Sequence, residues 1–472
     1  MKRSWLCAVI VVALFAAMPA LGADTNAPAL DGRKVSLLWG VPFVGILLSI
    51  AILPLVAAHF WHHHFGKVSA AWAILLLVPL ALVFGPAVTL YEVVHLMLLD
   101  YIPFIILLLA LFTVTGGIHI RGNLHGSPSM NTALLAIGTV LAGWMGTTGA
   151  SMLLIRPVIR ANDDRRHKVH VFVFFIFLVS NIGGALTPLG DPPLFLGFLK
   201  GVDFFWTTTN LFFEMLVCAI VLLALFYALD VYWYRKEGHL KVDPTPDQPI
   251  RVEGGINIIL LMAVVAAVLM SGTWKPGVQF TIFHVTVELQ NVTRDLALLA
   301  ICGLSLKLTR KQIRQDNAFG WGPMAEVAKL FAGIFITIAP VIAILRAGPE
   351  GDMAPLVSMV SAADGRPNDV WYFWLTGILS SFLDNAPTYL VFFNLAGGDA
   401  QVLMGALAST LVAISCGAVF MGANTYIGNA PNFMVKAVVE DAGIRMPSFF
   451  GYMAWSCVIL LPLFVLITFL FF

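Results

Sequence analysis

The sequence predicts an all-α protein that crosses a membrane many times. Of its 472 residues, 59% are hydrophobic and 11% are charged, whereas roughly 25% of the residues of an average soluble domain are charged. Apolar runs of about 20 residues, enough for a helix to cross a ~30 Å hydrocarbon core, recur along the chain. Two of these runs are interrupted by similar polar clusters. We therefore expect about 10–11 transmembrane helices in two related halves.

The first interruption is the stretch 180–193, with the sequence SNIGGALTPLGDPP. Proline removes backbone donors and glycine loosens a helix, and hydrocarbon offers no water to satisfy the groups left free. Such a break is tolerated at membrane depth only where protein or a water-filled cavity satisfies the backbone. The sequence therefore predicts a broken helix over 169–200.

A related stretch lies near the other end of the chain. Residues 184–193 align with 422–431, and Gly, Ala, Thr, Gly and Pro are identical in the pairing. Two such breaks at corresponding places in two halves point to the binding site of a secondary transporter. We expect the second broken helix over 401–439.

A re-entrant hairpin is predicted before each broken helix. The first hairpin, 130–155, has a small, polar tip around Thr147 and Thr148. The second, 370–395, has its tip at 380–388. The shift of 238 residues that brings 184 onto 422 also brings Gly146 onto Asp384, so a single shift aligns both features.

The rest of the chain completes this organisation. Lys2 and Arg3 precede an apolar stretch and then small residues, the pattern of a signal peptide. The predicted segments are a signal peptide at 1–22, N-terminal helices at 36–90, a first repeat at 91–232, a cytoplasmic linker at 233–254, connecting helices at 255–317 and a second repeat at 318–472. Between the spans 36–58 and 68–90 we expect a His-rich turn at the membrane interface. Glu92, His95 and Asp100 are expected at the outer surface.

Basic residues predict the orientation. Lys and Arg concentrate at 156–168, 235–251 and 307–314, and such residues favour the cytoplasmic side. The mature N-terminus then lies outside, in a bacterial-type inner (plasma) membrane. The two hairpins enter from opposite sides, and the two repeats are inverted.

Polar residues at the breaks and tips are the candidate site. Neutral oxygens suit a small hard cation such as sodium. Placing a carboxylate at membrane depth costs roughly 2.5–3.5 kcal/mol or more, so a carboxylate found there is expected to have a function. The candidate substrate and ion ligands are Asn181, Thr187, Asp191, Asn424, Thr425, Asn429, Thr147, Thr148, Asp384, Asn385 and Thr388. A sodium ion is expected at Asp384, Asn181 and Asn424.

The two carboxylates each leave an alternative open. Asp384 binds a proton and a cation in turn, or it makes a structural hydrogen bond to the hairpin backbone. Asp191 is a ligand, or it caps the helix that follows the break.

The motifs SNIGGxxTxxGDPP at 180–193 and LDNxP at 383–387 resemble the ion transporter superfamily, and within it NhaD-type sodium/proton antiporters and the related citrate and arsenite carriers. The resemblance covers roughly 35–472 and implies two inverted repeats in a homodimer. Two departures stand out. The antiporters typically have Asp-Asn in both hairpin tips, whereas the first tip here is 146–149, GTTG. The dicarboxylate carriers have Ser-Asn-Thr in both tips, and neither tip here has it.

The sequence thus predicts a sodium/proton antiporter that works by alternating access. The alternative is a sodium- or proton-coupled symporter of citrate or a related organic anion. A membrane-embedded enzyme would need a His-x-x-x-His, Ser/Lys or paired-Asp arrangement on spanning helices, which is not found. We expect the lipid bilayer and a small ion or organic anion as partners, sodium or the proton as coupling ion, no cofactor and no nucleic acid.

The orientation is testable by cysteine labelling. Single cysteines introduced in 156–168 and in 348–369 should react with a membrane-impermeant maleimide from opposite sides of the membrane, because basic residues hold the first segment in the cytoplasm. Native cysteines that react are first replaced by serine. Labelling of both segments from the same side would rule out the inverted topology.

Overall fold

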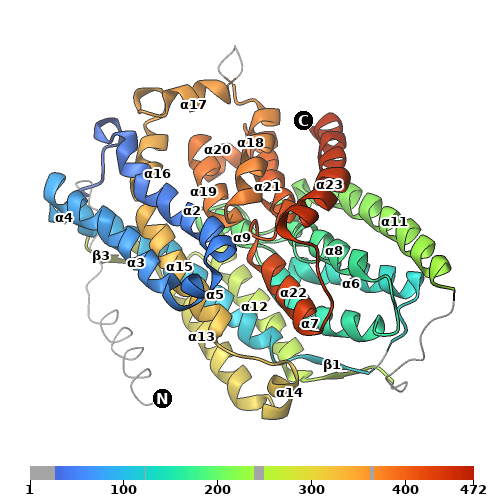
Figure 1. Ribbon diagram of the computed structural model, residues 1–472. Helices are drawn as coiled ribbons and strands as arrows, with labels where there is room; N and C mark the ends of the chain where they lie inside the picture. Colours follow the sequence, from blue (N-terminus) through green and yellow to red (C-terminus); the bar gives the residue numbers. More distant parts are fainter. Residues whose placement is uncertain (1–26, 123, 239–248, 362–365) are drawn as a thin grey trace.

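The computed structural model describes residues 27–122, 124–238, 249–361 and 366–472. The predicted signal peptide and the middle of the predicted cytoplasmic linker lie outside these residues. Helices dominate the described chain (Figure 1), whose named strands form two small antiparallel pairs, β1 with β2 and β3 with β4.

The elements follow one another closely along the chain. The first part contains η1 (Gly32–Lys34), η2 (Leu37–Gly40), α2 (Val41–Val56), α3 (Ala58–Val83), α4 (Pro86–Leu96), η3 (Met97–Tyr101), α5 (Ile102–Thr115), β1 (His119–Arg121), α6 (Pro128–Met145), α7 (Thr147–Ala161), α8 (Val169–Leu178), η4 (Ile182–Leu186), α9 (Pro192–Leu199), α10 (Trp206–Asn210) and α11 (Phe212–Glu237). The second contains β2 (Arg251–Glu253), α12 (Ile256–Thr273), β3 (Gln279–Ile282), β4 (Val285–Glu288), α13 (Leu289–Leu308), α14 (Lys311–Asp316), α15 (Gly322–Thr337), α16 (Ala339–Arg346), η5 (Gly348–Glu350), α17 (Ala354–Met359), α18 (Asp369–Phe382), α19 (Asn385–Leu395), α20 (Ala400–Met404), α21 (Ala408–Met421), η6 (Gly422–Asn424), α22 (Ala430–Asp441) and α23 (Phe449–Phe471).

The helices have the length and composition of membrane spans. Within the described residues, seven are long and apolar enough to cross a membrane, and α15 with α16, bent by 41° at a short break, makes up to eight. A shorter apolar segment, Ala408–Asn424, comprises α21 and η6. The predicted class, an all-α polytopic membrane protein, is confirmed.

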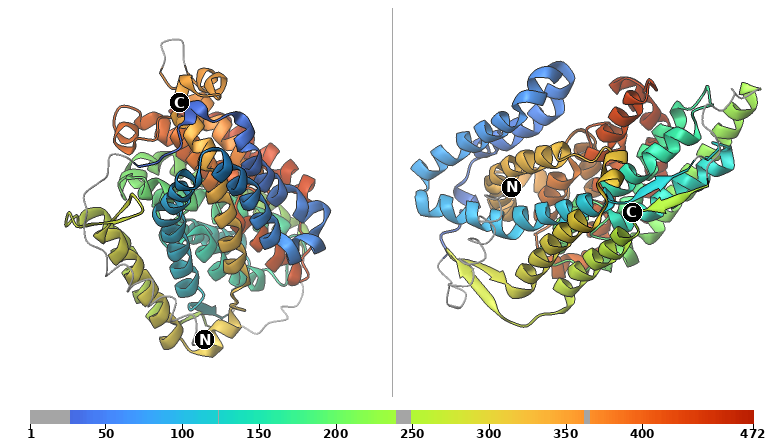
Figure 2. Two further views of the ribbon diagram at one scale, coloured as in Figure 1. Left: turned by 90° about the vertical axis from the view of Figure 1, so that its left-hand side faces the viewer. Right: turned by 90° about the horizontal axis from the view of Figure 1, so that it is seen from below.

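The interrupted segments lie in the middle of the molecule. In Figure 1, α2 and α3 lie on one side and α11 and α23 on the other, and α8, α9, α19, α21 and α22 fill the space between. Helices α12 and α13 pack against each other and against α5, along one edge of the molecule (Figure 2). Long apolar helices thus surround the short helices that contain the predicted site residues.

Two local predictions are wrong. The His-rich segment 59–67 is part of α3, because the chain breaks earlier, at Ala57, which has a non-helical backbone between α2 and α3. Asp100 is buried, with 1% of its surface exposed, because the chain stays helical from α4 through η3 into α5. Lys200 reaches it, with Nζ 2.6 Å from Oδ1.

A buried polar network fastens the first hairpin and α8 to α11. The carboxylate of Asp230 accepts hydrogen bonds from Arg165 Nη2 at 2.8 Å and Asn131 Nδ2 at 3.0 Å, and His170 Nε2 lies 2.9 Å from it. Arg165 and Asp230 both have fully buried side chains. Since a buried charge is tolerated only with such partners, this network helps to fix where the hairpin lies.

Asp230→Ala should therefore destabilise the protein by about 1.5–3 kcal/mol, because it removes one of the two carboxylates that pair with the buried Arg165 and leaves Glu237 as its remaining ion-pair partner among the described residues. The exposed pair of Arg121 and Glu253, 3.1 Å apart, provides the control, since Glu253→Ala should cost about 1 kcal/mol or less. Thermal unfolding of the purified variants in one detergent measures both. Equal effects of the two substitutions would contradict this role of the network.

Candidate substrate and ion site

Two hairpins and two broken helices meet at the centre of the molecule. The first hairpin consists of α6 and α7 with Gly146 between them, and the second of α18 and α19 with Leu383 and Asp384 between them. The broken segments are α8–η4–α9 and α21–η6–α22. Contacts cross between the halves, because α19 packs on α9 and α22 packs on α7. A site at this junction therefore draws on both halves of the chain.

Each break is held to its own hairpin in the same way. Thr187 Oγ1 donates to the carbonyl oxygen of Gly143, and Thr425 Oγ1 donates to that of Ser381. Each hydroxyl also accepts the backbone N–H two residues further on, at 3.1 and 3.2 Å. Donors and acceptors in the two halves differ by the same 238 residues that relate the motifs. These bonds satisfy backbone groups that hydrocarbon would leave without partners.

Close backbone contacts explain one repeated glycine. A Cβ atom at Gly190 would collide with the carbonyl oxygen of Gly184, and one at Gly428 with that of Gly422. The chain therefore folds back on itself within each break as tightly as a glycine allows. These contacts follow the same spacing in both halves, whereas the inversion of the halves across the membrane stays a prediction.

Four helices begin at this junction. Their N-cap residues are Gly146 for α7, Asp191 for α9, Asp384 for α19 and Asn429 for α22. A helix N-terminus has a partial positive charge and free N–H groups. The junction is therefore suited to hold negative charge, from a carboxylate of the chain or from a bound anion.

Asp191 links all of these parts. Its Oδ1 accepts hydrogen bonds from Thr147 Oγ1 at 2.9 Å and from Asn429 Nδ2 at 3.1 Å, and its Oδ2 accepts one from Asn385 Nδ2. These donors come from the first hairpin, the second break and the second hairpin. Asp191 is 1% exposed, and its ion-pair and hydrogen-bond partners among the described residues include no Lys, Arg or His. The predicted ligand is thus a buried carboxylate that receives three neutral donors.

A set of asparagines joins the two breaks directly. Asn181 Nδ2 donates to Asn432 Oδ1 at 2.7 Å, and Asn429 Nδ2 lies 3.2 Å from Asn181 Oδ1. Asn432 also donates to backbone oxygens of the second break, those of Gly422 and Thr425, both at 2.8 Å. Sequence reasoning missed Asn432, because the 238-residue shift pairs it with the apolar Leu194. Its position three residues after Asn429, on the same helix face, could have revealed it.

Asp384 is placed differently from Asp191. Its half-buried carboxylate accepts the N–H of Ala386 at 3.0 Å and so caps α19, and its carbonyl oxygen accepts a hydrogen bond from Thr388 Oγ1 at 3.0 Å. Asp384 directly precedes Asn385, whose side chain donates to Asp191. The structural contact considered from the sequence is thus present, and the chain places a second carboxyl group near the first.

Two of the predicted ligands have side-chain oxygen atoms that accept no hydrogen bond from the described residues. Asn424 Nδ2 donates to Ser381 Oγ at 2.9 Å, while the Oδ1 atoms of Asn424 and Asn385 have no hydrogen-bond partner among the described residues. Neutral amide oxygens of this kind are suited to a small hard cation. No group of three or more His, Cys, Asp or Glu residues in the described chain could hold a metal ion.

A cavity of about 120 Å³ reaches Asp191. Thr147 and Thr148 line it at the hairpin tip, together with residues of the first break and apolar side chains of α5, α15 and α22. A small ion fits this volume more easily than a large organic molecule. Of the predicted site residues, Thr147, Thr148 and Asp191 line the cavity, and the others do not.

Comparison with known proteins relates the chain to transporters. Residues 32–472 match the model of a family described as "Putative citrate transport". The chain belongs to this family. It is also 24% identical, over 331 residues, to uncharacterised transporters of Mycobacterium bovis and Mycobacterium tuberculosis, a match that covers 68% of this chain and 71% of each relative. The predicted superfamily is confirmed, and the chain is a multi-pass membrane transporter.

The tight turn in the first break is testable with Gly190→Ala. The added methyl group meets backbone rather than a flexible side chain, so we expect a loss of about 1–3 kcal/mol of stability. Gly303→Ala, where a Cβ atom meets open space, should be neutral or slightly stabilising. Thermal unfolding of both variants measures these changes in stability. A Gly190→Ala protein as stable as wild type would refute the close approach.

Proposed function

We propose that this transporter exchanges sodium ions for protons by alternating access, with Asp191 as the central ion ligand. The observation that supports this most is the buried Asp191 carboxylate, which receives three neutral donors and no basic side chain. A negative charge at membrane depth is costly, and helix N-termini offset only part of it. A bound sodium ion or a proton would neutralise the rest.

The neighbouring groups fit such an exchange. Asp384, which directly precedes Asn385, adds a second carboxylate near Asp191, and the free amide oxygens of Asn385 and Asn424 supply ligands of the kind sodium prefers. Because two like charges so close together repel each other, we propose that binding one cation and releasing another keeps the pair near a constant charge. The proton and sodium would therefore compete for the same site.

Alternating access requires the junction to move relative to the surrounding helices. The hairpins and broken helices are linked to one another by the bonds of Asp191, Asn181 and Asn432, so we propose that they move as one body. The homodimer implied by the family resemblance and the inner-membrane location are part of this proposal. In it, the surrounding long helices supply the fixed frame.

A second candidate is sodium- or proton-coupled symport of an organic anion. The description of the family, citrate transport, favours it. The four helix N-termini at the junction could hold a substrate carboxylate without a basic side chain. In that case the cation at Asp191 would be the coupling ion, and both candidates would need the same carboxylate.

Flux in proteoliposomes distinguishes the two candidates. Sodium and pH gradients are imposed independently, and internal pH, sodium-22 uptake and labelled citrate uptake are recorded. For an antiporter, an imposed sodium gradient changes the internal pH of the vesicles without any added anion. For a symporter, sodium or proton flux requires the anion. Sodium flux that responds to neither protons nor anions would contradict both.

Asp191→Asn tests the central ligand. It preserves the shape but removes the charge, so coupled sodium flux should fall to background at matched expression. Asp384→Asn should reduce coupling, and Asp384→Glu should retain part of it. Asp399→Asn is the control, since Asp399 is an exposed N-cap of α20 and Asn caps helices equally well. Wild-type flux with unchanged proton coupling in Asp191→Asn would refute the proposal.

A further inference from the structure

One face of α7 leads from the cavity at Asp191 towards the end of this helix. Thr148, Met152 and Arg156 are spaced four residues apart, so they lie on the same face. Thr148 lines the cavity at Asp191, Met152 lines a small cavity of about 10 Å³, and Arg156 lines a third of about 330 Å³. The three cavities therefore follow one another along roughly 12 Å of the helix.

Helix α22 supplies a second wall along this face. Ala430 and Met434 line the central cavity, and Val438 lines the third cavity. These residues are again four positions apart and each is at least partly exposed, whereas the neighbouring Val435 and Val439 are fully buried. Because α7 packs against α22, the two faces form one groove, which we call the α7 groove.

The α7 groove is narrowest beside Met152. The cavity there is also lined by Phe112 of α5 and by Phe319, whose ring centroids are 5.1 Å apart. A Cβ atom at Gly116 would collide with the Phe319 ring, and the Arg314 guanidinium lies 4.8 Å from the centre of that ring. A space of about 10 Å³ accommodates at most about one water molecule. The aromatic side chains of the frame therefore leave no room for a hydrated ion at this point.

Arg156 joins the first hairpin to the frame at this narrow point. Its Nη1 donates to the carbonyl oxygen of Asn317 at 2.7 Å, and Asn317 lines the small cavity. The side chain of Asn317 is itself held in place, since its Nδ2 donates to the carbonyl oxygens of Gly116 at 3.0 Å and Ile118 at 2.7 Å. In the described chain no Asp or Glu forms an ion pair with Arg156. The guanidinium thus has a backbone carbonyl of the frame as its partner.

A second bond lies one turn further along α7. Arg160 Nη2 donates to the carbonyl oxygen of Ile120, in β1, at 2.7 Å. Hydrogen bonds from a charged donor are roughly twice as strong as those between neutral groups. In Figure 1, β1 and α14 lie at the bottom of the molecule. The hairpin is therefore tied to the frame at the end where the α7 groove reaches the exposed Asp441 and Ala442.

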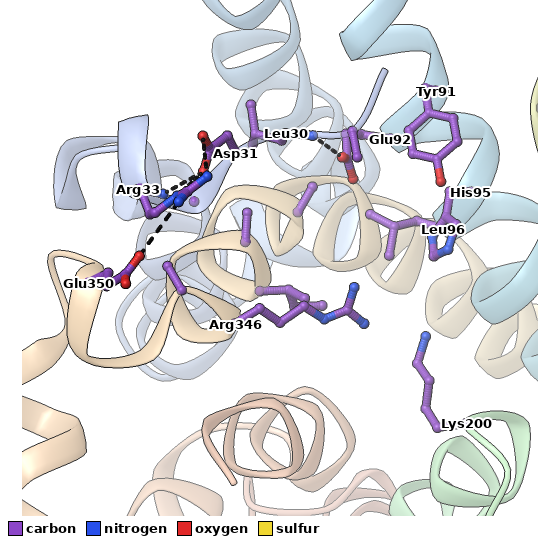
Figure 3. A pocket seen from close by; sticks show the side chains of 16 residues that line it. Leu30, Asp31, Arg33, Tyr91, Glu92, His95, Leu96, Lys200, Arg346 and Glu350 are labelled. Atoms are coloured by element: carbon purple, nitrogen blue, oxygen red, sulfur yellow. Dashed lines mark hydrogen bonds and ion pairs between the residues drawn. The ribbon is translucent and has the colours of Figure 1, made fainter. Parts of the chain in front are cut away.

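Charged side chains join the same two bodies at the other end as well. A recess of about 380 Å³ lies there, between α4, α16 and the end of α9 (Figure 3). Lys200, directly after α9, has its Nζ 2.6 Å from Oδ1 of Asp100 in the frame. Arg346 of the frame donates from Nε to the amide oxygen of Asn394, in the second hairpin, at 3.0 Å. Movement of the body relative to the frame must therefore break contacts at one end or the other.

We propose that the α7 groove is the route between Asp191 and the predicted cytoplasmic face, and that Arg156 holds it closed through its bond to Asn317. When this bond breaks, the hairpin shifts relative to the aromatic side chains of the frame. The apolar constriction beside Met152 then widens and takes up water, so that a hydrated ion passes. Arg156 does not touch the ion and is a positioning residue. This inference rests on the proposed function, for which it names the route.

Cysteine accessibility in the full-length protein tests the route. Single cysteines replace Met434, on the Asp191 side of the narrow point, and Val438, on its open side. A membrane-impermeant maleimide is added to one side at a time of oriented membrane vesicles, and the labelled fraction is followed by mass spectrometry. The relevant side is the one from which cysteines in 156–168 are labelled.

The expected rates differ between the two positions. With Arg156 present, Val438→Cys should react readily and Met434→Cys slowly. Arg156→Gln should accelerate the labelling of Met434→Cys about tenfold or more, because a charge-assisted hydrogen bond no longer holds the closed form. Val435→Cys, at a fully buried position, should stay unreactive in every variant that keeps its fold.

Matched variants separate the bond from other effects of the charge. Arg121→Gln removes an exposed arginine that pairs within the frame, 3.1 Å from Glu253, and should leave both labelling rates unchanged. Phe319→Ala widens the narrow point without changing any charge. It should therefore accelerate the labelling of Met434→Cys but not that of Val438→Cys.

Labelling does not require transport, so its result is independent of the flux measurements. If sodium–proton exchange is absent but Arg156→Gln still accelerates Met434→Cys selectively, the route stands and the proposed function fails. The route is overturned if Arg156→Gln leaves the labelling of Met434→Cys unchanged or accelerates Val438→Cys equally. It is also overturned if the maleimide reaches Met434→Cys only from the opposite side.

Discussion

The Asp191 carboxylate is the contact on which the centre of this transporter depends. Each half of the chain contains a hairpin and a broken helix, and by itself neither half places its donors around a single group. Thr147 comes from the first hairpin, Asn385 from the second and Asn429 from the second break, and all three converge on one buried side chain. Removing the whole carboxyl group would leave three donors without their acceptor, which is costly in a buried site.

A second constraint is the satisfaction of backbone groups where the helices break. Hydrocarbon offers no hydrogen bonds, so every freed N–H and C=O must find a partner in the protein. Thr187 and Thr425 meet this need in equivalent ways, and glycines let the chain return close to itself. The same breaks also create helix N-termini. The arrangement that satisfies the backbone at each break therefore also provides a place for negative charge.

Charge is distributed differently at the two recesses. Around Asp191 the ligands are carboxylates, amides and hydroxyls, which suits a cation. The recess between α4, α16 and the end of α9 is instead lined by basic and acidic side chains alike, Arg33, Lys200 and Arg346 with Asp31, Glu92 and Glu350. Between them lies α9, a helix of eight residues. Asp191, Asn385 and Asn429 are buried inside the protein, so the centre can retain polar groups that hydrocarbon would exclude.

Local composition was enough to determine the fold class, the family and the positions of both breaks, because apolar length and Gly/Pro interruptions act on neighbouring residues. The 238-residue shift also related Thr187 to Thr425 and Asp191 to Asn429 before any contact was known. Composition could not assign roles to the two carboxylates: Asp384 caps its own helix, whereas Asp191 collects donors up to 238 residues away in sequence. The contacts of Asn432 and the pairing of Lys200 with Asp100 could not be predicted from the sequence either. Such contacts depend on how separate segments pack, and only the tertiary structure brings those segments together.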